Sequence, residues 1–171
     1  ILDWTPAQFP RYASGLEKFD GTPLYERQNP AEAIHPFWGT LLYNYGSPMV
    51  KDFLISNACF WAEVYHADGL RMDDVDAMLY LDYGRNPGEW TPNIYGTNEN
   101  LDALEFLKHL NSVIKERNPG LLLVAQENGL WPELTDSVEN DHLGFDYKWS
   151  GGWTKDLLEY LSKDPIERKN Y

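Results

Sequence analysis

The residues of this chain best suited to chemistry are an arginine and an aspartate two positions apart. They end the segment Asp68-Gly-Leu-Arg-Met-Asp73, which comes directly after an amphipathic helix pattern. The segment predicts a buried strand, and the carboxyl ends of parallel strands are where α/β barrels build active sites. Arg71 and Asp73 would point to the same side, so the guanidinium can hold the carboxylate ionised. Such an aspartate suits the nucleophile of a glycosyl-transferring enzyme, although an ordinary ion pair closing a strand also fits.

The charge balance argues against polyanionic partners. The 171 residues include 27 acidic and 14 basic side chains, for a net charge of -13. Nucleic acids and anionic membrane surfaces need clustered positive charge, so neither is expected as a partner. No apolar run approaches the roughly 20 residues of a membrane span, and no signal peptide opens the sequence. A single cysteine, Cys59, rules out an internal disulfide and fits a cytoplasmic protein.

Aromatic residues are frequent, at 15% of the chain, and several lie in loop-like stretches. Examples are 89–95 and 147–149, where Trp and Tyr stand beside acidic, amide or basic residues. Aromatic faces with nearby carboxylates and amides suit sugar rings, which offer apolar C–H faces and a rim of hydroxyls. Aromatics that only filled a core would follow a helix or strand period. The pattern therefore favours a sugar ligand over simple packing.

The elements that must position Asp73 alternate between strands and helices. Strands are expected over 1–3, 69–73, 121–125 and, more weakly, 143–147, and helices over 48–65, 98–117 and 154–162. Two long loops, over 4–46 and 74–95, separate them, the second with some helical character at 77–79. This alternation predicts a single α/β domain with a parallel sheet and right-handed crossovers.

Together these segments resemble the α-1,4-glucan branching enzymes of the α-amylase superfamily, glycoside hydrolase family 13. The resemblance covers essentially the whole chain. The strings that carry it include Ile1-Leu-Asp-Trp-Thr-Pro6, Phe19-Asp-Gly-Thr-Pro-Leu-Tyr25, Trp38-Gly-Thr-Leu-Leu-Tyr-Asn-Tyr45, Asp68-Gly-Leu-Arg-Met-Asp73, Met78-Leu-Tyr-Leu-Asp-Tyr83, Gly88-Glu-Trp-Thr-Pro-Asn93 and Leu143-Gly-Phe-Asp-Tyr-Lys-Trp149. The Met78–Tyr83 and Gly88–Asn93 strings are more typical of branching enzymes than of amylases generally.

The resemblance implies a partial (β/α)8 TIM barrel with long βα loops. Residues 1–171 would be a fragment of the catalytic barrel domain, covering roughly the third to sixth β/α units. A fourth motif with a His-Asp pair would lie beyond Tyr171. A half barrel has uncovered sheet edges and an inner face without a partner, so the 171 residues alone are expected to aggregate or self-associate.

The resemblance also assigns roles to particular residues. Asp73 would be the nucleophile and Arg71 the arginine of the same motif. Asp3 would be the aspartate of the first motif. The substrate-binding set expected here is Asp3, Gln8, Tyr80, Trp90 and Trp149. For the three aromatic residues, packing within the loops is an equally good interpretation.

Two positions depart from the family's motifs. The first motif ends in histidine, where this chain has Gln8, and its amide can still hydrogen-bond a sugar hydroxyl. The family's general acid/base stands where this chain has Gln126. An amide can neither protonate a leaving oxygen nor activate an incoming hydroxyl. Glu127 is next in sequence but should point to the opposite face, so it could replace the acid only if the strand end turned or bulged.

For an intact family member the resemblance implies a retaining reaction on α-glucans such as glycogen and amylose. The nucleophile attacks an α-1,4 linkage, and the 6-hydroxyl of another chain captures the glycosyl-enzyme as an α-1,6 branch. No metal or organic cofactor is implied, and the isolated fragment is expected to be inactive. Two alternatives stay open: a non-catalytic glucan-binding or structural relative, which Gln8 and Gln126 suggest, and an α-amylase-type hydrolase.

Overall fold

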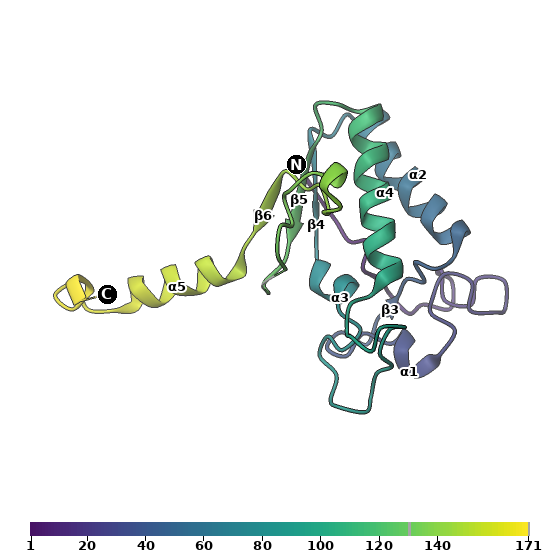
Figure 1. Ribbon diagram of the computed structural model, residues 1–171, viewed down its shortest axis with the longest axis horizontal. Coiled ribbons are helices and arrows are strands. Elements are labelled where there is room, and N and C mark those ends of the chain that lie inside the picture. The colour runs from purple at the N-terminus through teal and green to yellow at the C-terminus, as the bar shows by residue number, and fades with distance from the viewer. Residues whose placement is uncertain (130, 171) are drawn as a thin grey trace.

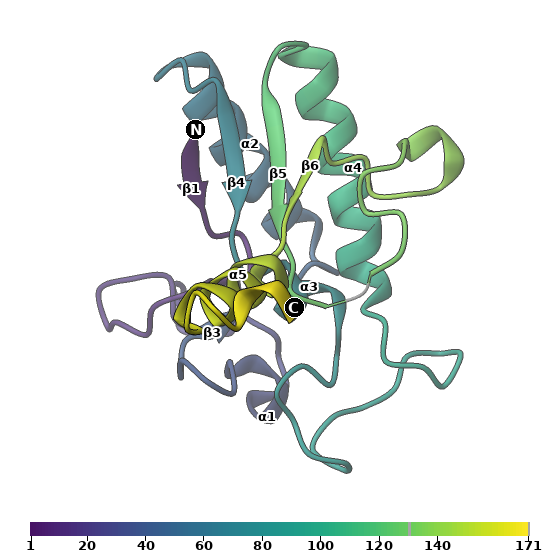
Figure 2. The ribbon, with the colours of Figure 1, turned by 90° about the vertical axis from the view of Figure 1, so that its left-hand side faces the viewer.

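The computed structural model describes residues 1–129 and 131–170, and its centre is a four-stranded parallel sheet. The strands are β1 (Leu2–Trp4), β4 (Gly69–Met72), β5 (Leu122–Gln126) and β6 (Tyr147–Trp149). They lie side by side in the order β1-β4-β5-β6. Figure 1 labels β4, β5 and β6, and Figure 2 shows β1 beside them as well. Each strand pairs with the next one along the chain, as consecutive strands of a (β/α)8 barrel do. The predicted alternation and parallel sheet are confirmed.

Two long helices, α2 (Pro48–Glu63) and α4 (Leu101–Arg117), cover one face of this sheet (Figure 1). Proline occupies the first turn of α2, where its missing N–H costs nothing, and Asn100 caps α4 by accepting the Ala103 N–H at 3.4 Å. Alternate strand residues pack beneath these helices. The side chains of Leu70, Met72, Leu123 and Ala125 are completely buried, as are Phe106, Leu107, Leu110 and Ile114 of α4.

The opposite face of the sheet carries no helix and faces the viewer in Figure 2. Strand residues on this face therefore stay exposed even where they are large and apolar. Leu122, Tyr147 and Trp149 are 38%, 59% and 56% exposed. We call the surface that contains them the open face.

The loops at the carboxyl ends of the strands contain short elements that the sequence does not predict. The segment 4–46 holds an antiparallel pair, β2 (Gln8–Phe9) with β3 (Leu41–Leu42), and a helix α1 (Pro30–Ala33). Elements of two to four residues are too short to show a period. The helical character expected near 77–79 is confirmed as α3 (Val75–Leu79).

The fourth strand begins later than predicted. The segment expected over 143–147 is a loop up to Asp146, and β6 covers Tyr147–Trp149. Gly144 has a φ of +75°, which breaks extended structure, while Leu143 and Phe145 are buried in the core without strand pairing. Burial of these two side chains produces the apolar pattern that suggests a strand.

The carboxyl-terminal helix α5 (Gly151–Ser162) projects away from the rest of the molecule, as Figure 1 shows. None of its residues is buried, and Trp153, Leu158 and Leu161 are 67%, 62% and 50% exposed. Two 3-10 turns, η1 (Val138–Asn140) and η2 (Arg168–Asn170), complete the described elements.

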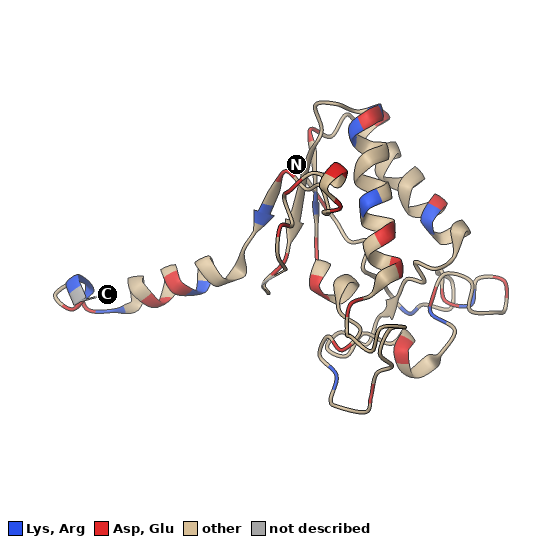
Figure 3. Cartoon of the chain, in the orientation of Figure 1, with Lys and Arg blue, Asp and Glu red and all other residues tan. Residues whose placement is uncertain are grey.

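Lys and Arg residues are scattered along the chain among the more numerous acidic ones (Figure 3). No helix in the described part of the chain is both long and apolar enough to cross a membrane.

The open face and α5 predict that the 171 residues, produced alone, self-associate or aggregate at micromolar concentration, because large apolar side chains there are exposed. Light scattering during size-exclusion chromatography measures the mass. The double variant Leu158→Ser/Leu161→Ser should reduce association, whereas Tyr65→Ser, at an exposed aromatic residue beyond α2, should not. A well-folded monomer of the unmodified chain would contradict this expectation.

Candidate active site

Arg71 links two carboxylates of the expected site, the substrate-binding Asp3 and the nucleophile Asp73. Its Nη1 lies 2.9 Å from Asp3 Oδ1, and its Nη2 lies 3.0 Å from Asp73 Oδ1. The guanidinium carbon also lies over the Trp149 ring, 5.5 Å from the ring centroid. Side chains from β1, β4 and β6 and the residue after β4 therefore meet at the open face.

Strand register explains this meeting. Asp3 pairs directly with Arg71 across β1 and β4, so both side chains lie on the same face. The backbone N–H of Asp73 donates to Trp4 O at 2.9 Å, which continues the pairing one residue beyond β4. The Asp73 side chain is 41% exposed, so a ligand at the open face can reach it.

Gln126 lies on the same face as Asp73. Arg71 of β4 pairs with Val124 of β5. Two residues further along both strands, the same register places Asp73 opposite Gln126. Gln126 Oε1 accepts the backbone N–H of Asp74 at 3.1 Å. This contact assigns the amide oxygen, and the amide nitrogen makes no hydrogen bond within the described residues. Gln126 therefore offers hydrogen-bond donors beside Asp73, but no exchangeable acid.

Glu127 points away from Asp73. Its side chain is completely buried and forms an ion pair with Lys148 Nζ. No bulge interrupts β5, since pairing with β6 runs through Gln126 and Trp149, and the Glu127 N–H then donates to Trp149 O at 3.3 Å. The strand end does not make the turn that would bring Glu127 to the open face.

Asp74 is a site residue that sequence reasoning missed. Its backbone is left-handed, with φ +61° and ψ +37°, so the chain turns sharply after Asp73. Asp74 Oδ2 accepts hydrogen bonds from Gln8 Nε2 at 2.7 Å and from His35 Nε2 at 2.9 Å. The Thr40 hydroxyl in turn donates to Gln8 Oε1, which fixes the orientation of that amide. The Asp74 carboxylate thus fixes Gln8, the residue that departs from the first motif.

The contacts of His35 indicate which of its ring nitrogens acts as the hydrogen-bond donor. This completely buried ring accepts the Phe37 backbone N–H at its Nδ1 (3.2 Å), so Nε2 carries the proton donated to Asp74. Tyr83 packs edge-on against the ring, at 5.8 Å between centroids. Burial and the nearby Asp74 carboxylate raise the pKa of Tyr83 to about 12, so it is a hydroxyl donor at neutral pH. The sequence gives no period or motif from which this contact could have been found.

A second acidic group lies behind the end of β5. Asp76, buried in α3, accepts the Asn128 N–H at 2.9 Å through Oδ2. Burial, together with the neighbouring Glu127 carboxylate, raises the pKa of Asp76 to about 6, against the lowering effect of the Asn128 N–H. Lys148, the partner of Glu127, also donates to Gly129 O at 2.9 Å. These contacts hold the residues after Gln126 in place.

The three aromatic residues of the expected substrate set are in different surroundings. Trp149 lies at the open face beside a cavity of about 370 Å³, which it lines with Trp153. The Tyr80 ring packs edge-on against Trp131 at 5.5 Å. Trp90 lies in the loop after α3, next to Thr91, whose hydroxyl donates to Glu32 of α1 at 2.8 Å. Of these three aromatic residues, only Trp149 lies against Arg71. Substrate binding by all three stays a prediction.

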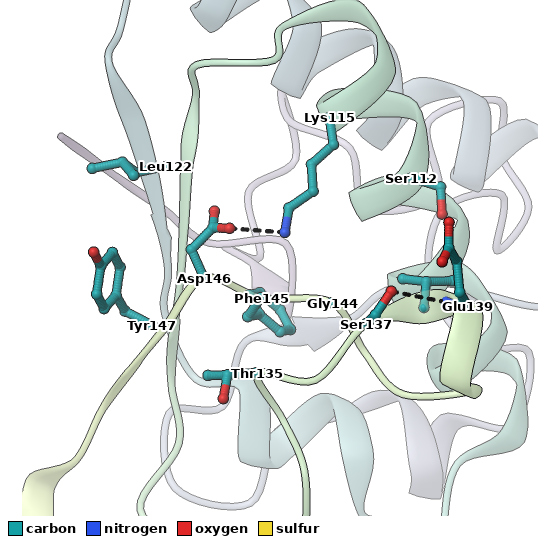
Figure 4. Close-up of a pocket in the computed structure, with 11 residues that line it drawn as sticks. Ser112, Lys115, Leu122, Thr135, Ser137, Glu139, Gly144, Phe145, Asp146 and Tyr147 are labelled. Carbon is teal, nitrogen blue, oxygen red and sulfur yellow. Dashed lines mark hydrogen bonds and ion pairs between the residues drawn. The ribbon is translucent and has the colours of Figure 1, made fainter.

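A cavity of greater volume than the one beside Trp149 lies elsewhere in the described residues. It has a volume of about 610 Å³ and is lined by the first residues of β5 and β6, Leu122 and Tyr147, together with part of α4. Figure 4 shows Lys115 and Asp146 pointing toward each other there, 2.8 Å apart. This is the opposite end of the sheet from Asp73, and barrel enzymes build active sites at the carboxyl ends of their strands. No group of three or more His, Cys, Asp or Glu in the described chain could hold a metal ion.

Comparison with curated proteins confirms the resemblance to branching enzymes. The chain is 53% identical to "1,4-alpha-glucan branching enzyme GlgB" of Methylococcus capsulatus over 98% of its length, and 51% identical to the protein of that name from Thermobifida fusca over 99%. It spans only 23% of the length of each of these relatives. No protein-family profile matches the chain.

Solved structures show the same fold. A noncanonic maltogenic alpha-amylase, AmyB from Thermotoga neapolitana, aligns with a TM-score of 0.58 at 11% identity, over 97% of this chain and 31% of that protein. An Anoxybacillus alpha-amylase aligns with a TM-score of 0.62 at 14% identity, over 95% of this chain and 32% of that one. The expected α/β class and partial barrel are therefore confirmed.

The raised pKa of Asp76 predicts a pH-dependent stability. The ordinary pKa is 3.8, so between pH 3.8 and about 6 the folded chain keeps a proton that the unfolded chain has released. The contribution of Asp76 to the free energy of unfolding should therefore fall by roughly 2–3 kcal/mol as the pH rises through this window, and level off above it. Urea unfolding at about pH 4 and about pH 7 measures the difference.

Asp76→Asn should lack this fall, because the amide keeps an acceptor for Asn128 and carries no charge. The matched control is Asp52→Asn, at an exposed position of α2, and it should behave like the unmodified protein. An Asp76→Asn profile that falls with pH as steeply as the control would show that Asp76 titrates normally.

Proposed function

We propose that the protein carrying this chain acts on α-1,4-glucan, with Asp73 as the nucleophile. The observation that carries the proposal is the exposed Asp73 carboxylate held by Arg71, which also pairs with Asp3 and lies over Trp149. An oriented carboxylate beside an exposed indole suits a sugar ring, whose C–H face can stack while its hydroxyls meet charged groups. The name of the relatives supplies the substrate class, with glycogen and amylose as examples. The 171 residues would form part of the catalytic barrel domain of a cytoplasmic protein.

With its general acid in place, a site of this type would carry out branching with retention of configuration. An Asp73 oxygen bonds to the anomeric carbon while the bond from that carbon to the 4-oxygen of the next glucose breaks. The 6-hydroxyl of another glucan chain then displaces Asp73 and loses its proton, which gives an α-1,6 branch. Retention requires a second carboxyl group about 5–5.5 Å from the nucleophile to donate and then accept the proton. Gln126, on the adjacent strand, stands where that group is expected.

The amide at 126 separates two candidate functions. With a general acid elsewhere, the site branches glucan. Without one, the site binds glucan and turns it over slowly or not at all. The geometry favours the second outcome for the chain as it stands, since Glu127 is buried with Lys148 and the Asp74 carboxylate already accepts two hydrogen bonds. We therefore propose a branching-type glucan site that lacks its proton donor.

Gln126→Glu should create or raise branching activity by about 10²-fold or more, because a positioned general acid contributes about that factor. The assay is incubation of amylose with the protein at the full length that its gene encodes, and then NMR for α-1,6 linkages. New reducing ends without branches would instead indicate a hydrolase.

Two control variants accompany this assay. Gln126→Ala, which removes the side chain without supplying an acid, should gain no activity. Glu127→Gln should leave any activity of the unmodified protein unchanged if that carboxylate takes no part. If the unmodified protein branches amylose and Glu127→Gln abolishes that activity, the proposal that the site lacks its acid is contradicted.

The nucleophile can be tested without the acid. In an α-glucosyl fluoride, fluoride leaves with its electron pair and needs no proton, so Asp73 can bond to the anomeric carbon unaided. The glycosyl–Asp73 ester should then accumulate, because Gln126 cannot deprotonate an acceptor hydroxyl. Mass spectrometry of the intact protein detects the added glucosyl group. Azide, which needs no base, should release it as an α-glucosyl azide.

Asp73→Asn should form no adduct under these conditions, and an adduct on any other residue would remove Asp73 from the role of nucleophile. Asp82→Asn, at a loop acid that is hydrogen-bonded to Asn98, serves as the matched control and should react normally.

A further inference from the structure

A polar cavity separate from the Asp73 site lies among the loops near the start of α4. Its volume is about 330 Å³. Its walls come from the residues before and within α1, the turn before α2, the loop after α3 and the first turn of α4. The lining side chains that matter most are Arg27, Glu32, Asn44, Tyr45, Asn100 and Asp102.

Arg27 is the unusual member of this cavity. Its guanidinium is half-buried, and no hydrogen bond or ion pair to it is formed by the residues that the structure describes. Burial lowers the pKa of Arg27, yet an arginine stays protonated at neutral pH. Because no described residue accepts a hydrogen bond from this half-buried guanidinium, its five N–H donors are available for a ligand.

Other polar groups of the cavity are also unengaged. Within the described residues, neither the Asn44 amide nor the Asp102 carboxylate takes part in a side-chain hydrogen bond. Both groups converge over Gly46, where an added Cβ would lie 3.0 Å from Asp102 Oδ2 and 3.4 Å from Asn44 Oδ1. A larger residue than glycine would therefore crowd these two groups.

The remaining wall is rigid. The Tyr45 hydroxyl donates to Pro6 O at 2.9 Å, and its ring stacks on Phe106 with 5.2 Å between centroids. Asn100 uses its side-chain oxygen to cap α4 and is buried. The cavity therefore presents unengaged donors and acceptors on a fixed frame, which is the arrangement that pre-formed ligand sites show.

The charges around the cavity select against ions. Arg27 lies near Arg85, whose guanidinium is bound to the carbonyls of Ala31 and Ile34 at 2.7 and 2.8 Å. The carboxylates of Glu32 and Asp102 lie near Arg27 as well. Two positive and two negative groups therefore surround the cavity. An anion there would be repelled by the two carboxylates, and a cation by the two guanidinium groups. A neutral molecule with many hydroxyls can use donors and acceptors of both kinds.

We propose that this cavity is a second saccharide-binding site, which holds one or two neutral sugar units apart from Asp73. Its volume is at the lower end of the range for small-molecule sites, about 300–1,000 Å³. The choice of a glucan as the saccharide rests on the proposed function. A glucan chain held there would be anchored at a point that takes no part in bond cleavage.

The experiment is hydrogen–deuterium exchange of the protein at the full length that its gene encodes, with and without maltotetraose. Binding in the cavity should protect the peptides that cover 25–46 and 98–104. Binding at the open face should instead protect 69–74. Arg27→Ala should weaken the first protection about tenfold, since it removes hydrogen bonds from a charged donor. Asn44→Ala should act in the same direction, and Arg117→Ala, at the far end of α4, should change nothing.

A structural role for Arg27 is separated by thermal unfolding. Loss of an unpaired, half-buried charge should leave the Tm of Arg27→Ala unchanged or raised while saccharide binding falls. Protection at 69–74 alone overturns this inference and leaves the proposed function standing. Protection at 25–46 and 98–104 alone supports it and counts against glucan binding beside Asp73. Protection of the cavity peptides by inorganic phosphate rather than maltotetraose, or equal effects of Arg27→Ala and Arg117→Ala, also overturns it.

Discussion

The constraint on which the site depends is the placement of one guanidinium between two carboxylates of neighbouring strands. Asp3 and Asp73 face the same side of the sheet on neighbouring strands. Without a cation between them, these two like charges would repel each other. Arg71 meets both at about hydrogen-bond distance and also lies over Trp149. A single side chain therefore couples the ends of β1, β4 and β6, so the geometry around Asp73 depends on the pairing of the whole sheet.

The two-residue period of β5 decides which group stands beside Asp73. Leu123 and Ala125 are completely buried against the helices, so Gln126 must lie on the open face and Glu127 must not. Exchanging the two would require a one-residue slip that moves both apolar side chains out of the core. Glu127 therefore cannot replace the missing acid, although it is next to Gln126 in the sequence. Glu127 instead has a buried ion-pair partner in Lys148, which gives it a structural use of its own.

The elements that could be predicted from the sequence are those whose apolar residues recur at helix or strand spacing. β4, β5, α2 and α4 are predictable from apolar spacing, and the alternation of a strand places Arg71 with Asp73 and separates Gln126 from Glu127. The Asp74 contacts could not be predicted in this way. These join Asp74 to residues 39 and 66 positions away, and they depend on a left-handed backbone that no pattern predicts. The strand predicted over 143–147 differs from β6 because Leu143 and Phe145 lie in a loop and still pack into the core. Their apolar character therefore does not indicate strand pairing.

The order of the sheet has a consequence for how this layer is made. Each strand pairs with its successor in the chain, and α2 and α4 pack on the same face between them. Each pairing involves only segments that come no later in the chain than the second strand of the pair, so the layer can form in stages as the polypeptide leaves the ribosome. The helix-covered layer could then be assembled early, with its other surface still open to segments synthesised afterwards. Chaperones would be needed most during that interval, when tryptophan and leucine side chains face water.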